Sequence, residues 1–352
     1  MINIFVHENN QRTIRRLTKA GGAFANLRAV IYQDVFRSLS VPVGTAIFTD
    51  LEFLSPLERE VAASMALAIG QAAPGTPVLN HPAHACERYE LLRRMQLKGA
   101  SPVTVLRVDS GDMPEKYPVF IRSEDGCAGP ETGLIENAER YVEAVAALKR
   151  NGKPAKGRIA LSYEAVPQPD GYFRKYGVFR VGDHVIPQHI LYNRDWVVKS
   201  NELGRQPELV AEELAYMREN PHRELVMDAF DTGELQFGRA DFGFMDGRFV
   251  LYEINTNPTF PRFQGGSPER AERRDMIREQ LRQAFAAIDD GVAARRPVPF
   301  MPLQPYRRFL ETRSWGLRRR WTWLTRAFLL RRRHERGDAK LLPQVDSSSE
   351  QP

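Results

Sequence analysis

The stretch Phe237–Phe260, FGRADFGFMDGRFVLYEINTNPTF, determines how the rest of this chain is interpreted. Two apolar runs, Phe242–Met245 and Phe249–Leu251, flank the dipeptide Asp246-Gly247, which is typical of tight hairpin turns. The pattern therefore predicts two short antiparallel strands joined by a turn. Polar side chains interrupt the apolar pattern at the outer ends of both strands.

Four of these polar side chains form a candidate site. Residues two apart on a strand share a face, so Arg239 lies on the same face as Asp241, and Glu253 on the same face as Asn255. Two carboxylates and an amide oxygen make a hard, oxygen-rich site that suits Mg²⁺ and the phosphates of a nucleotide. The alternative is a hairpin with a charged, solvated edge. The conjunction of four residue types at this spacing favours the metal site.

The R-x-D pattern, the hairpin and the segment E-I-N-T-N-P together resemble the metal-binding end of the ATP-grasp enzymes. D-alanine–D-alanine ligase, glutathione synthetase and the ribosomal-protein glutamate ligases belong to that family. The resemblance implies that Asp241, Glu253 and Asn255 hold two Mg²⁺ ions, or Mn²⁺ in their place, on the phosphates of ATP. It also implies that Arg239 faces an acyl-phosphate intermediate. ATP and the metal ion are the cofactors expected on this basis.

The first 85 residues alternate strand and helix, which predicts a small α/β lobe. The expected elements are strands at Ile2–Val6, Gly44–Asp50 and Val78–Asn80 and a helix at Leu57–Ala73. Residues 14–39 are helix-compatible, with an interruption at two glycines. Asp50 and Asn80 fall at strand ends, where ligands bind in open α/β sheets. Capping and turn hydrogen bonds are the more common explanation for such residues.

The resemblance implies an α/β (α+β) fold in which the small α/β lobe of residues 1–85 precedes the two α+β lobes of an ATP-grasp fold. The nucleotide lobe is expected at 86–166, the metal-binding and catalytic lobe at 167–304, a basic helical tail at 305–340 and a disordered end at 341–352. Arg88 lies near the start of the helix expected at Ala85–Leu97. The family often has a lysine aimed at ATP there, although a helical arginine is usually just solvated.

The strand expected at Tyr117–Arg122 leads into a loop with glycines at positions 126, 129 and 133. Glycine lets backbone N–H groups approach phosphate oxygens closely, and a plain surface loop is the alternative. By resemblance, Arg122 takes the place of the family's lysine on the α- and β-phosphates. The planar guanidinium group of arginine can donate two hydrogen bonds to one phosphate group. Gly126 and Gly129 then belong to a lid over the nucleotide.

The strand expected at Arg158–Val166 ends in a segment that resembles the hinge between the two ATP-grasp lobes. The resemblance implies that the backbone of Ala165 and Val166 pairs with the edge of the adenine. Glu164 stands beside them as a further cofactor-binding residue. An acidic side chain in this region would bind the ribose, and Asp170 is a candidate for that role.

Phe173–Trp196 predicts two strands around a Gly-Asp turn. The alternation places Lys175 on the site-facing side, where it would meet the γ-phosphate or a substrate carboxylate. Lys199 and Asn201 follow in a region where the family has basic residues and an asparagine, which implies contacts with phosphate or substrate. His189 is either a base or, as is more common for a lone histidine in a strand, structural.

The charge of the chain is concentrated at its C-terminal end. The chain has 352 residues, 42% hydrophobic residues and a net charge of +6. From Pro305 onward, 12 Lys and Arg stand against 5 Asp and Glu, a net charge of +7, so residues 1–304 carry −1. A nearly neutral body does not have the charge expected of a nucleic-acid-binding protein, and no nucleic-acid partner is expected.

Residues 306–336 are rich in arginine and contain three tryptophans in an amphipathic pattern. A helix of this kind suits the surface of an anionic membrane, a partner protein or the body of the protein itself. The chain has two cysteines and shows no signal peptide and no apolar run of spanning length. We therefore expect a cytoplasmic protein, peripheral to the membrane if the tail binds there.

The resemblance implies an ATP-dependent ligase that activates a carboxylate as an acyl phosphate and joins it to an amine. Arg239 and Lys175 are the expected catalytic residues, and the substrate is a small molecule or a peptide. This chemistry requires no side-chain nucleophile. One alternative is a phosphotransferase that uses the same metal ligands. The other is a non-catalytic ATP-binding module that its basic tail recruits to a membrane or a partner.

Overall fold

A computed structural model describes most of the first 301 residues, which form one compact unit. The described residues are 1–19, 24–125, 128–164, 166–199, 206–261, 263, 271–291 and 296–301. Gly126, Ala165, Asn201 and the segments predicted as a helical tail and a disordered end lie outside these ranges. Among the described helices, none combines the length and the hydropathy that crossing a bilayer requires.

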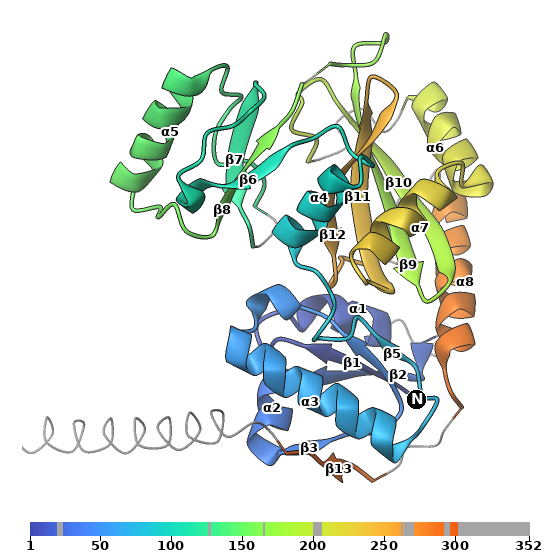
Figure 1. Ribbon diagram of the computed structural model, residues 1–352. Helices are drawn as coiled ribbons and strands as arrows, with labels where there is room; N and C mark the ends of the chain where they lie inside the picture. The colour runs from blue at the N-terminus through green and yellow to red at the C-terminus, as the bar shows by residue number, and fades with distance from the viewer. Residues whose placement is uncertain are drawn as a thin grey trace, which may run out of the picture. The chain divides into compact units, whose positions relative to one another are not determined.

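The first lobe contains a parallel sheet in the order β2-β1-β4-β5. Its elements are β1 (Ile2–Val6), α1 (Arg12–Lys19), β2 (Leu27–Ile31), α2 (Tyr32–Ser38), β3 (Ser40–Val41), β4 (Thr45–Phe48), η2 (Leu51–Phe53), α3 (Pro56–Ala72) and β5 (Val78–Leu79). The α3 helix begins at Pro56, one residue before the predicted start, and Ser55 and Glu58 form a reciprocal cap there. Figure 1 shows α3 across one face of this sheet. The predicted α/β alternation is confirmed.

The strand β2 was absent from the predicted elements. The sequence predicts a helix-compatible segment throughout 14–39, whereas Leu27–Ile31 pair in parallel with β1, from Ile2 opposite Leu27 to Val6 opposite Ile31. The helical expectation is wrong over these five residues. Their conformation is decided by hydrogen bonds to a strand more than 20 positions earlier, and propensity yields to such tertiary pairing.

The second lobe is built on an antiparallel sheet in the order β6-β8-β7. Its elements are α4 (Arg88–Leu97), β6 (Val105–Arg107), η3 (Val108–Ser110), β7 (Val119–Ser123), α5 (Ala138–Arg150) and β8 (Arg158–Ser162). Tyr141 and Leu148 of α5 pack against Ile121 and Ala160 of the sheet. This packing covers one face of the sheet and leaves the other face for the candidate site.

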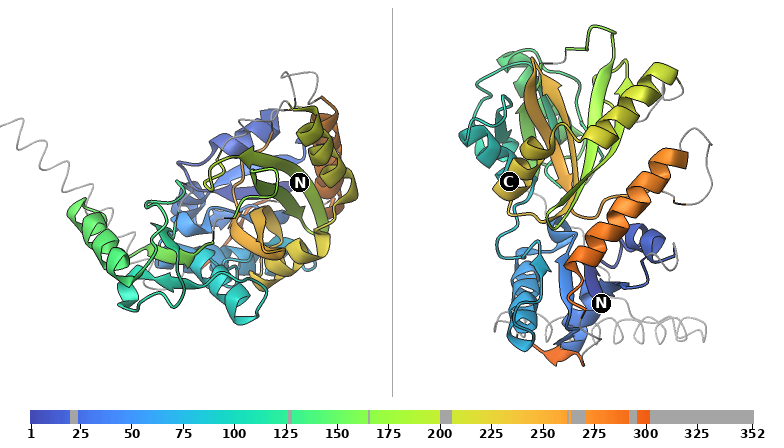
Figure 2. Two further views of the ribbon diagram at one scale, coloured as in Figure 1. Left: turned by 90° about the horizontal axis from the view of Figure 1, so that it is seen from above. Right: turned by 90° about the vertical axis from the view of Figure 1, so that its right-hand side faces the viewer.

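The third lobe is an antiparallel sheet in the order β10-β9-β11-β12, in which two hairpins pair through β9 and β11. Its elements are β9 (Phe173–Val181), β10 (His184–Asn193), α6 (Pro207–Glu219), α7 (Arg223–Thr232), β11 (Phe237–Met245), β12 (Arg248–Asn255) and α8 (Ala271–Ile288). Both hairpins that the turn dipeptides predict are confirmed. Figures 1 and 2 show α6, α7 and α8 packed along this sheet. The three lobes establish the predicted α+β class.

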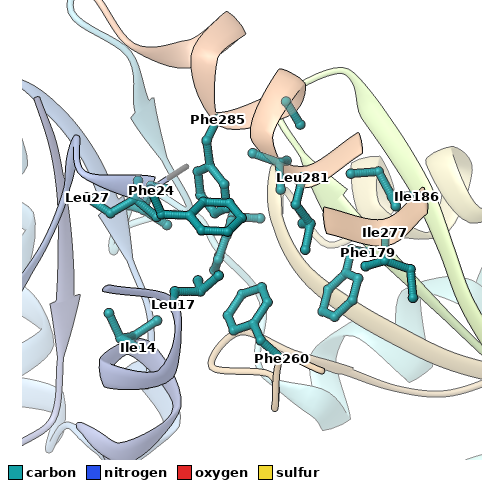
Figure 3. Packing of buried hydrophobic residues seen from close by; sticks show 14 of the residues in the cluster. Ile14, Leu17, Phe24, Leu27, Phe179, Ile186, Phe260, Ile277, Leu281 and Phe285 are labelled. Carbon is teal, nitrogen blue, oxygen red and sulfur yellow. The ribbon is translucent and has the colours of Figure 1, made fainter. Parts of the chain in front are cut away.

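An apolar cluster joins the first lobe to the third through α8. Figure 3 shows Leu281 of α8 beside Phe179 of β9, and Phe285 beside Phe24 of the first lobe. Phe179 also stacks on Phe260, which follows the hairpin, with ring centroids 5.2 Å apart. These contacts pack the end of β9 that lies beyond the candidate site.

After α8 the chain returns to the first lobe. The short strand β13 (Val298–Pro299) pairs with β3, and Asp289 accepts a hydrogen bond of 2.6 Å from the amino group of Met1. The segment predicted as the third lobe, 167–304, thus ends on a strand whose partner lies within residues 1–85. Pairing between residues so far apart in the sequence leaves no local pattern from which to predict it.

Candidate active site

The hairpin brings the four predicted polar residues onto one face. Asp241 lies directly opposite Glu253, and Arg239 directly opposite Asn255, across β11 and β12. The pairing shifts immediately after Asp241, which leaves Tyr252 as the extra residue of a β-bulge. Directly opposed residues have Cβ atoms about 5 Å apart, so their side chains share one environment. The prediction that these four residues converge is confirmed by this register.

Asp241 is bound by two cations. Arg239 donates two hydrogen bonds to its carboxylate, of 2.8 and 3.2 Å, and Lys175 donates a third of 3.0 Å. Asp241 is only 2% exposed. Burial raises the pKa of this carboxyl, but Arg239 and Lys175 outweigh burial and hold the pKa below its usual value. The carboxyl group of Asp241 is therefore ionised at neutral pH.

Glu253 also lies between two cations. Its Oε2 atom accepts hydrogen bonds from Arg88, at 2.6 Å, and from Arg122, at 3.0 Å. Arg88 donates in addition to the backbone oxygens of Ser123 and Glu124 at the end of β7. The two carboxylates of the hairpin thus face four cationic side chains. This excess of positive charge is suited to binding a polyanion such as a nucleoside triphosphate.

The carboxylates lie in the wall of a pocket between the second and third lobes, with a free space of about 850 Å³ that includes the solvent at its mouth. Phe120, Arg122 and Leu161 point into it, because strand alternation turns them away from the face that α5 covers. The polar lining consists mainly of Arg122, Ser162, Lys175, Lys199, Asp241 and Glu253.

Four aromatic side chains form much of the remaining lining: Phe120, Tyr163, Trp196 and Tyr252. The ring of Trp196 lies 5.2 Å from that of Phe120 and 5.7 Å from that of Tyr163. Aromatic rings at this spacing offer flat surfaces for a planar base. These residues were not predicted from the sequence. They lie on separate strands and loops, so only the tertiary fold brings them into one pocket.

Lys199 crosses the predicted phosphate loop. Its ammonium group donates to the backbone oxygen of Ala128, at 2.7 Å, directly beside Gly129. Gly129 has a φ of +87°, and a Cβ atom there would lie 2.7 Å from Cε of Lys199. The left-handed backbone therefore favours glycine at this position, and a Cβ atom would also push the end of the Lys199 side chain aside. Lys199, Gly129 and Arg122 all line the pocket.

Asn255 is oriented by the loop that follows β12. Its Oδ1 atom accepts a hydrogen bond of 2.9 Å from the backbone N–H of Asn257. The side chain of Asn257 in turn donates to both carboxylate oxygens of Asp50, at 3.0 and 2.9 Å. Asp50 is 1% exposed, and burial raises its pKa. Asp50 thus anchors the end of the hairpin to the first lobe, which supports the structural explanation for this strand-end residue.

The residues predicted as a hinge are placed differently. Glu164 and Val166 are exposed, and neither lines the pocket. Asp170 forms an ion pair of 2.6 Å with an arginine of β9. The strand β8 ends at Ser162, four residues earlier than predicted, so the chain leaves the sheet before the predicted hinge. Tyr163, immediately after the strand, lines the pocket instead.

The donor set of the hairpin fits a magnesium ion. Asp241 and Glu253 offer carboxylate oxygens, and Asn255 offers an amide oxygen, which are the hard ligands that Mg²⁺ and Mn²⁺ prefer. The amide oxygen of Asn255 accepts one hydrogen bond and has a second lone pair. The four surrounding cations now occupy the carboxylate oxygens that a metal ion would use.

No protein-family model matches this chain, and no curated protein matches it. Among solved structures it is similar to D-alanine–D-alanine ligase from Bacillus anthracis complexed with ATP (12% identity, 81% of this chain and 99% of that chain, TM-score 0.43). It is also similar to a RimK domain ATP-grasp protein from Sphaerobacter thermophilus (14% identity, 80% of this chain and 99% of that chain, TM-score 0.42). A third similar structure is that of the ATP-grasp ligase PsnB complexed with a phosphomimetic variant of its minimal precursor, Mg and ADP (13% identity, 82% of this chain and 96% of that chain, TM-score 0.49). The similarity is one of fold.

Proposed function

We propose that the protein is an ATP-dependent ligase that activates a carboxylate as an acyl phosphate and joins it to an amine. One observation carries this proposal: Asp241 and Glu253 lie opposite each other, each bound by two cations, in the wall of a pocket that is also lined by aromatic and cationic side chains. Hard oxygen ligands beside an excess of positive charge are what Mg²⁺ and a polyphosphate require.

The lining of the pocket supports ATP as the nucleotide. Its aromatic walls offer a stacking surface for the purine base. Arg122, Lys175 and Lys199 line the same pocket and would bind the phosphates, and Gly129 lets the backbone approach them closely. Of the predicted cofactor-binding residues, these four are the ones that the pocket supports.

The metal ligands of the proposed site are Asp241, Glu253 and Asn255. A bound Mg²⁺ neutralises phosphate charge and assists phosphoryl transfer. In the structure the two carboxylates are neutralised by arginine and lysine side chains instead. Metal binding would therefore release these arginine and lysine side chains from the carboxylates. The released side chains would then bind the phosphate oxygens of the nucleotide, which would lie next to them.

The chemistry follows from positioning and charge. The substrate carboxylate attacks the γ-phosphorus of ATP, and ADP leaves. The amine then attacks the acyl carbon, and inorganic phosphate leaves. Lys175 would bind the transferred phosphoryl group, and Arg239 would stabilise the acyl phosphate and the tetrahedral intermediate, because both cations lie beside Asp241. The scheme uses no side-chain nucleophile, and the acid and the amine belong to small molecules or peptides.

The proposal is tested by measuring ADP and phosphate release with Mg²⁺-ATP and a panel of carboxylates and amines, offered singly and in pairs. We expect ADP and phosphate in equal amounts only when an acid and an amine are both present. A stable phosphorylated product would contradict ligation and indicate a phosphotransferase. Binding of ATP without turnover across the whole panel would contradict the proposal that the protein is an enzyme.

Nucleotide binding has a built-in reporter. Trp196 is the only tryptophan in the described part of the chain, and it lines the pocket. We expect its fluorescence to change on addition of Mg²⁺ and AMPPNP, a non-hydrolysable ATP analogue. Trp196→Phe separates this signal from that of the three tryptophans beyond residue 305. A titration in which wild type and Trp196→Phe respond alike would contradict nucleotide binding in this pocket.

A further inference from the structure

A row of residues crosses all four strands of the third sheet through Asp241. His189 of β10 lies opposite Gly177 of β9, Gly177 lies opposite Asp241, and Asp241 lies opposite Glu253. Gly177 has no side chain, and the imidazole of His189 occupies the space above it. A Cβ atom at Gly177 would lie only 2.6 Å from Nε2 of His189. His189 therefore reaches across Gly177 towards the metal-binding residues.

The imidazole of His189 is buried and incompletely bonded. His189 is 9% exposed, and its Nε2 atom has no hydrogen-bond partner among the described residues. Burial lowers the pKa of His189 to about 3, assisted most by the positive charge of Arg239, so the ring is neutral at physiological pH. With its proton on Nδ1, a neutral imidazole has an acceptor at Nε2. Buried acceptors are rarely left unpaired without a functional or structural reason.

Arg239, the nearby cation with the largest effect on His189, would need a new hydrogen-bond acceptor if Asp241 bound a metal ion. Among the described residues its only hydrogen bonds go to the two oxygens of Asp241. A guanidinium has five N–H groups in a fixed plane, of which these bonds use two. When a metal ion takes the oxygens of Asp241, Arg239 loses both bonds. Its charge has a larger effect on the imidazole than that of any other nearby side chain.

We propose that His189 is a positioning residue for Arg239: its neutral Nε2 atom accepts a hydrogen bond from the guanidinium once Mg²⁺ and the nucleotide occupy the site. Arg239 is then held between His189 and the reacting phosphoryl group, with its plane fixed by the imidazole. This inference rests on the proposed function, because it requires that Asp241 bind a metal ion. Gly177 is part of the arrangement, since any side chain there would displace the ring.

The test is a ¹H–¹⁵N NMR spectrum of the histidine side chains of the full-length protein, which has seven histidines. The His189 signals are identified by their absence in His189→Gln. With saturating Mg²⁺ and AMPPNP we expect the unprotonated Nε2 resonance of His189 to move upfield, as a nitrogen does when it accepts a hydrogen bond. We expect no such shift in Arg239→Met, which keeps an unbranched apolar side chain but lacks the guanidinium donors.

Two outcomes overturn the inference in different ways. If Trp196 fluorescence reports saturated AMPPNP binding while the His189 signals stay unchanged, the positioning role is wrong and the proposed function stands. The same holds if Nε2 carries a proton in the complex. If AMPPNP does not bind at all, the proposed function fails and this inference fails with it.

Turnover supplies a second measurement. His189→Leu fills the volume of the ring without an acceptor, and His189→Gln supplies a side-chain oxygen. We expect the rate of ADP release to fall on the order of tenfold to a hundredfold in His189→Leu, with partial recovery in His189→Gln. The Kd of Mg²⁺-AMPPNP should stay within about twofold in both. His184→Leu, at an exposed position on the same strand, is the control. A lower unfolding temperature in His189→Leu with an unchanged rate would show a merely structural role.

Discussion

Arg88, the first residue of α4, donates a hydrogen bond of 2.6 Å to Glu253, which lies 165 positions later on β12. The same guanidinium donates to two backbone oxygens at the end of β7, and Arg122 of β7 binds the same carboxylate. One carboxylate thus connects the second lobe to the hairpin of β11 and β12. In the free protein, Glu253 therefore has a structural role beside the role proposed for it in metal binding.

Replacing Glu253 by Gln should destabilise the free protein. Arg88 and Arg122 are both largely buried, and the substitution leaves them facing an uncharged amide. Removing one partner of a buried ion pair typically costs about 3–5 kcal/mol. We expect the free energy of unfolding, measured by urea denaturation without metal, to fall by an amount near the lower end of that range.

The matched control is Glu224→Gln, which removes the ion pair between Arg223 and the 88% exposed side chain of Glu224. Exposed pairs of this kind contribute about 0–1 kcal/mol, so stability should barely change. Equal effects of the two substitutions would show that burial of the Glu253 cluster has no energetic consequence.

Asp241→Asn should greatly weaken magnesium-dependent nucleotide binding. The amide keeps the shape of the side chain but lacks the charge that binds the metal, a loss on the order of 2–3 kcal/mol, or about a hundredfold in affinity. The measurement is a Trp196 fluorescence titration with AMPPNP at saturating Mg²⁺. Asp246→Asn, at the exposed turn of the same hairpin, should bind as wild type does. An unchanged affinity in Asp241→Asn would refute the metal assignment.

Gly129→Ala should impair the pocket, whereas Gly133→Ala in the same loop should not. Gly129 has a φ of +87° and is in contact with Lys199, while a Cβ atom at Gly133 would meet nothing within 4 Å. The left-handed backbone alone costs alanine about 1–2 kcal/mol. We expect the Kd of AMPPNP, followed by Trp196 fluorescence, to rise about tenfold in Gly129→Ala. Equal affinities of the two variants would exclude a close approach of this loop to the nucleotide.

The stability of the protein should depend on pH through Asp241. Burial opposes ionisation, but Arg239 and Lys175 lower the pKa of Asp241 to about 2 in the folded state. The unfolded value is about 3.9. Because the folded pKa is the lower one, the stabilisation is fully present above the unfolded pKa and disappears as the pH falls from about 4 to about 2.

This pH dependence is measured as the difference in unfolding free energy between wild type and Asp241→Asn, which lacks the titrating group. We expect the difference to be constant from about pH 6 to about pH 5 and to shrink at lower pH. A difference that stays constant down to about pH 2.5 would mean that the carboxylate gains no stability from its two cations.

Local patterns in the sequence were sufficient to predict the strands that carry the proposed metal ligands. The dipeptides at Gly182 and Asp246 predicted both hairpins, and the alternation along β9 placed Lys175 on the side that faces Asp241. The helix predicted at Leu57–Ala73 corresponds to α3, whose start Ser55 caps. These features are predictable because a turn, a cap or a strand face depends on residues only a few positions apart.

The remaining parts of the site depend on contacts between distant residues. The helix-compatible segment around Leu27 became a strand because β1 was available to pair with it. The predicted hinge at Glu164 lies outside the pocket, since β8 ends early and Tyr163 takes the place beside Trp196. Local sequence patterns do not predict where a strand ends or which aromatic rings come into contact when tertiary packing decides both.

The sequence by itself thus determined which residues are proposed as oxygen ligands and on which strand faces they lie. Only the tertiary structure decided that Arg88 and Arg122 converge on Glu253, that Asp50 holds the end of the hairpin through Asn257, and that His189 reaches across Gly177. The physical reason is that ligand type and strand alternation are local properties. The charge and the shape of the pocket arise from side chains that are distant in the sequence, as Arg88 and Glu253 are at a separation of 165 positions.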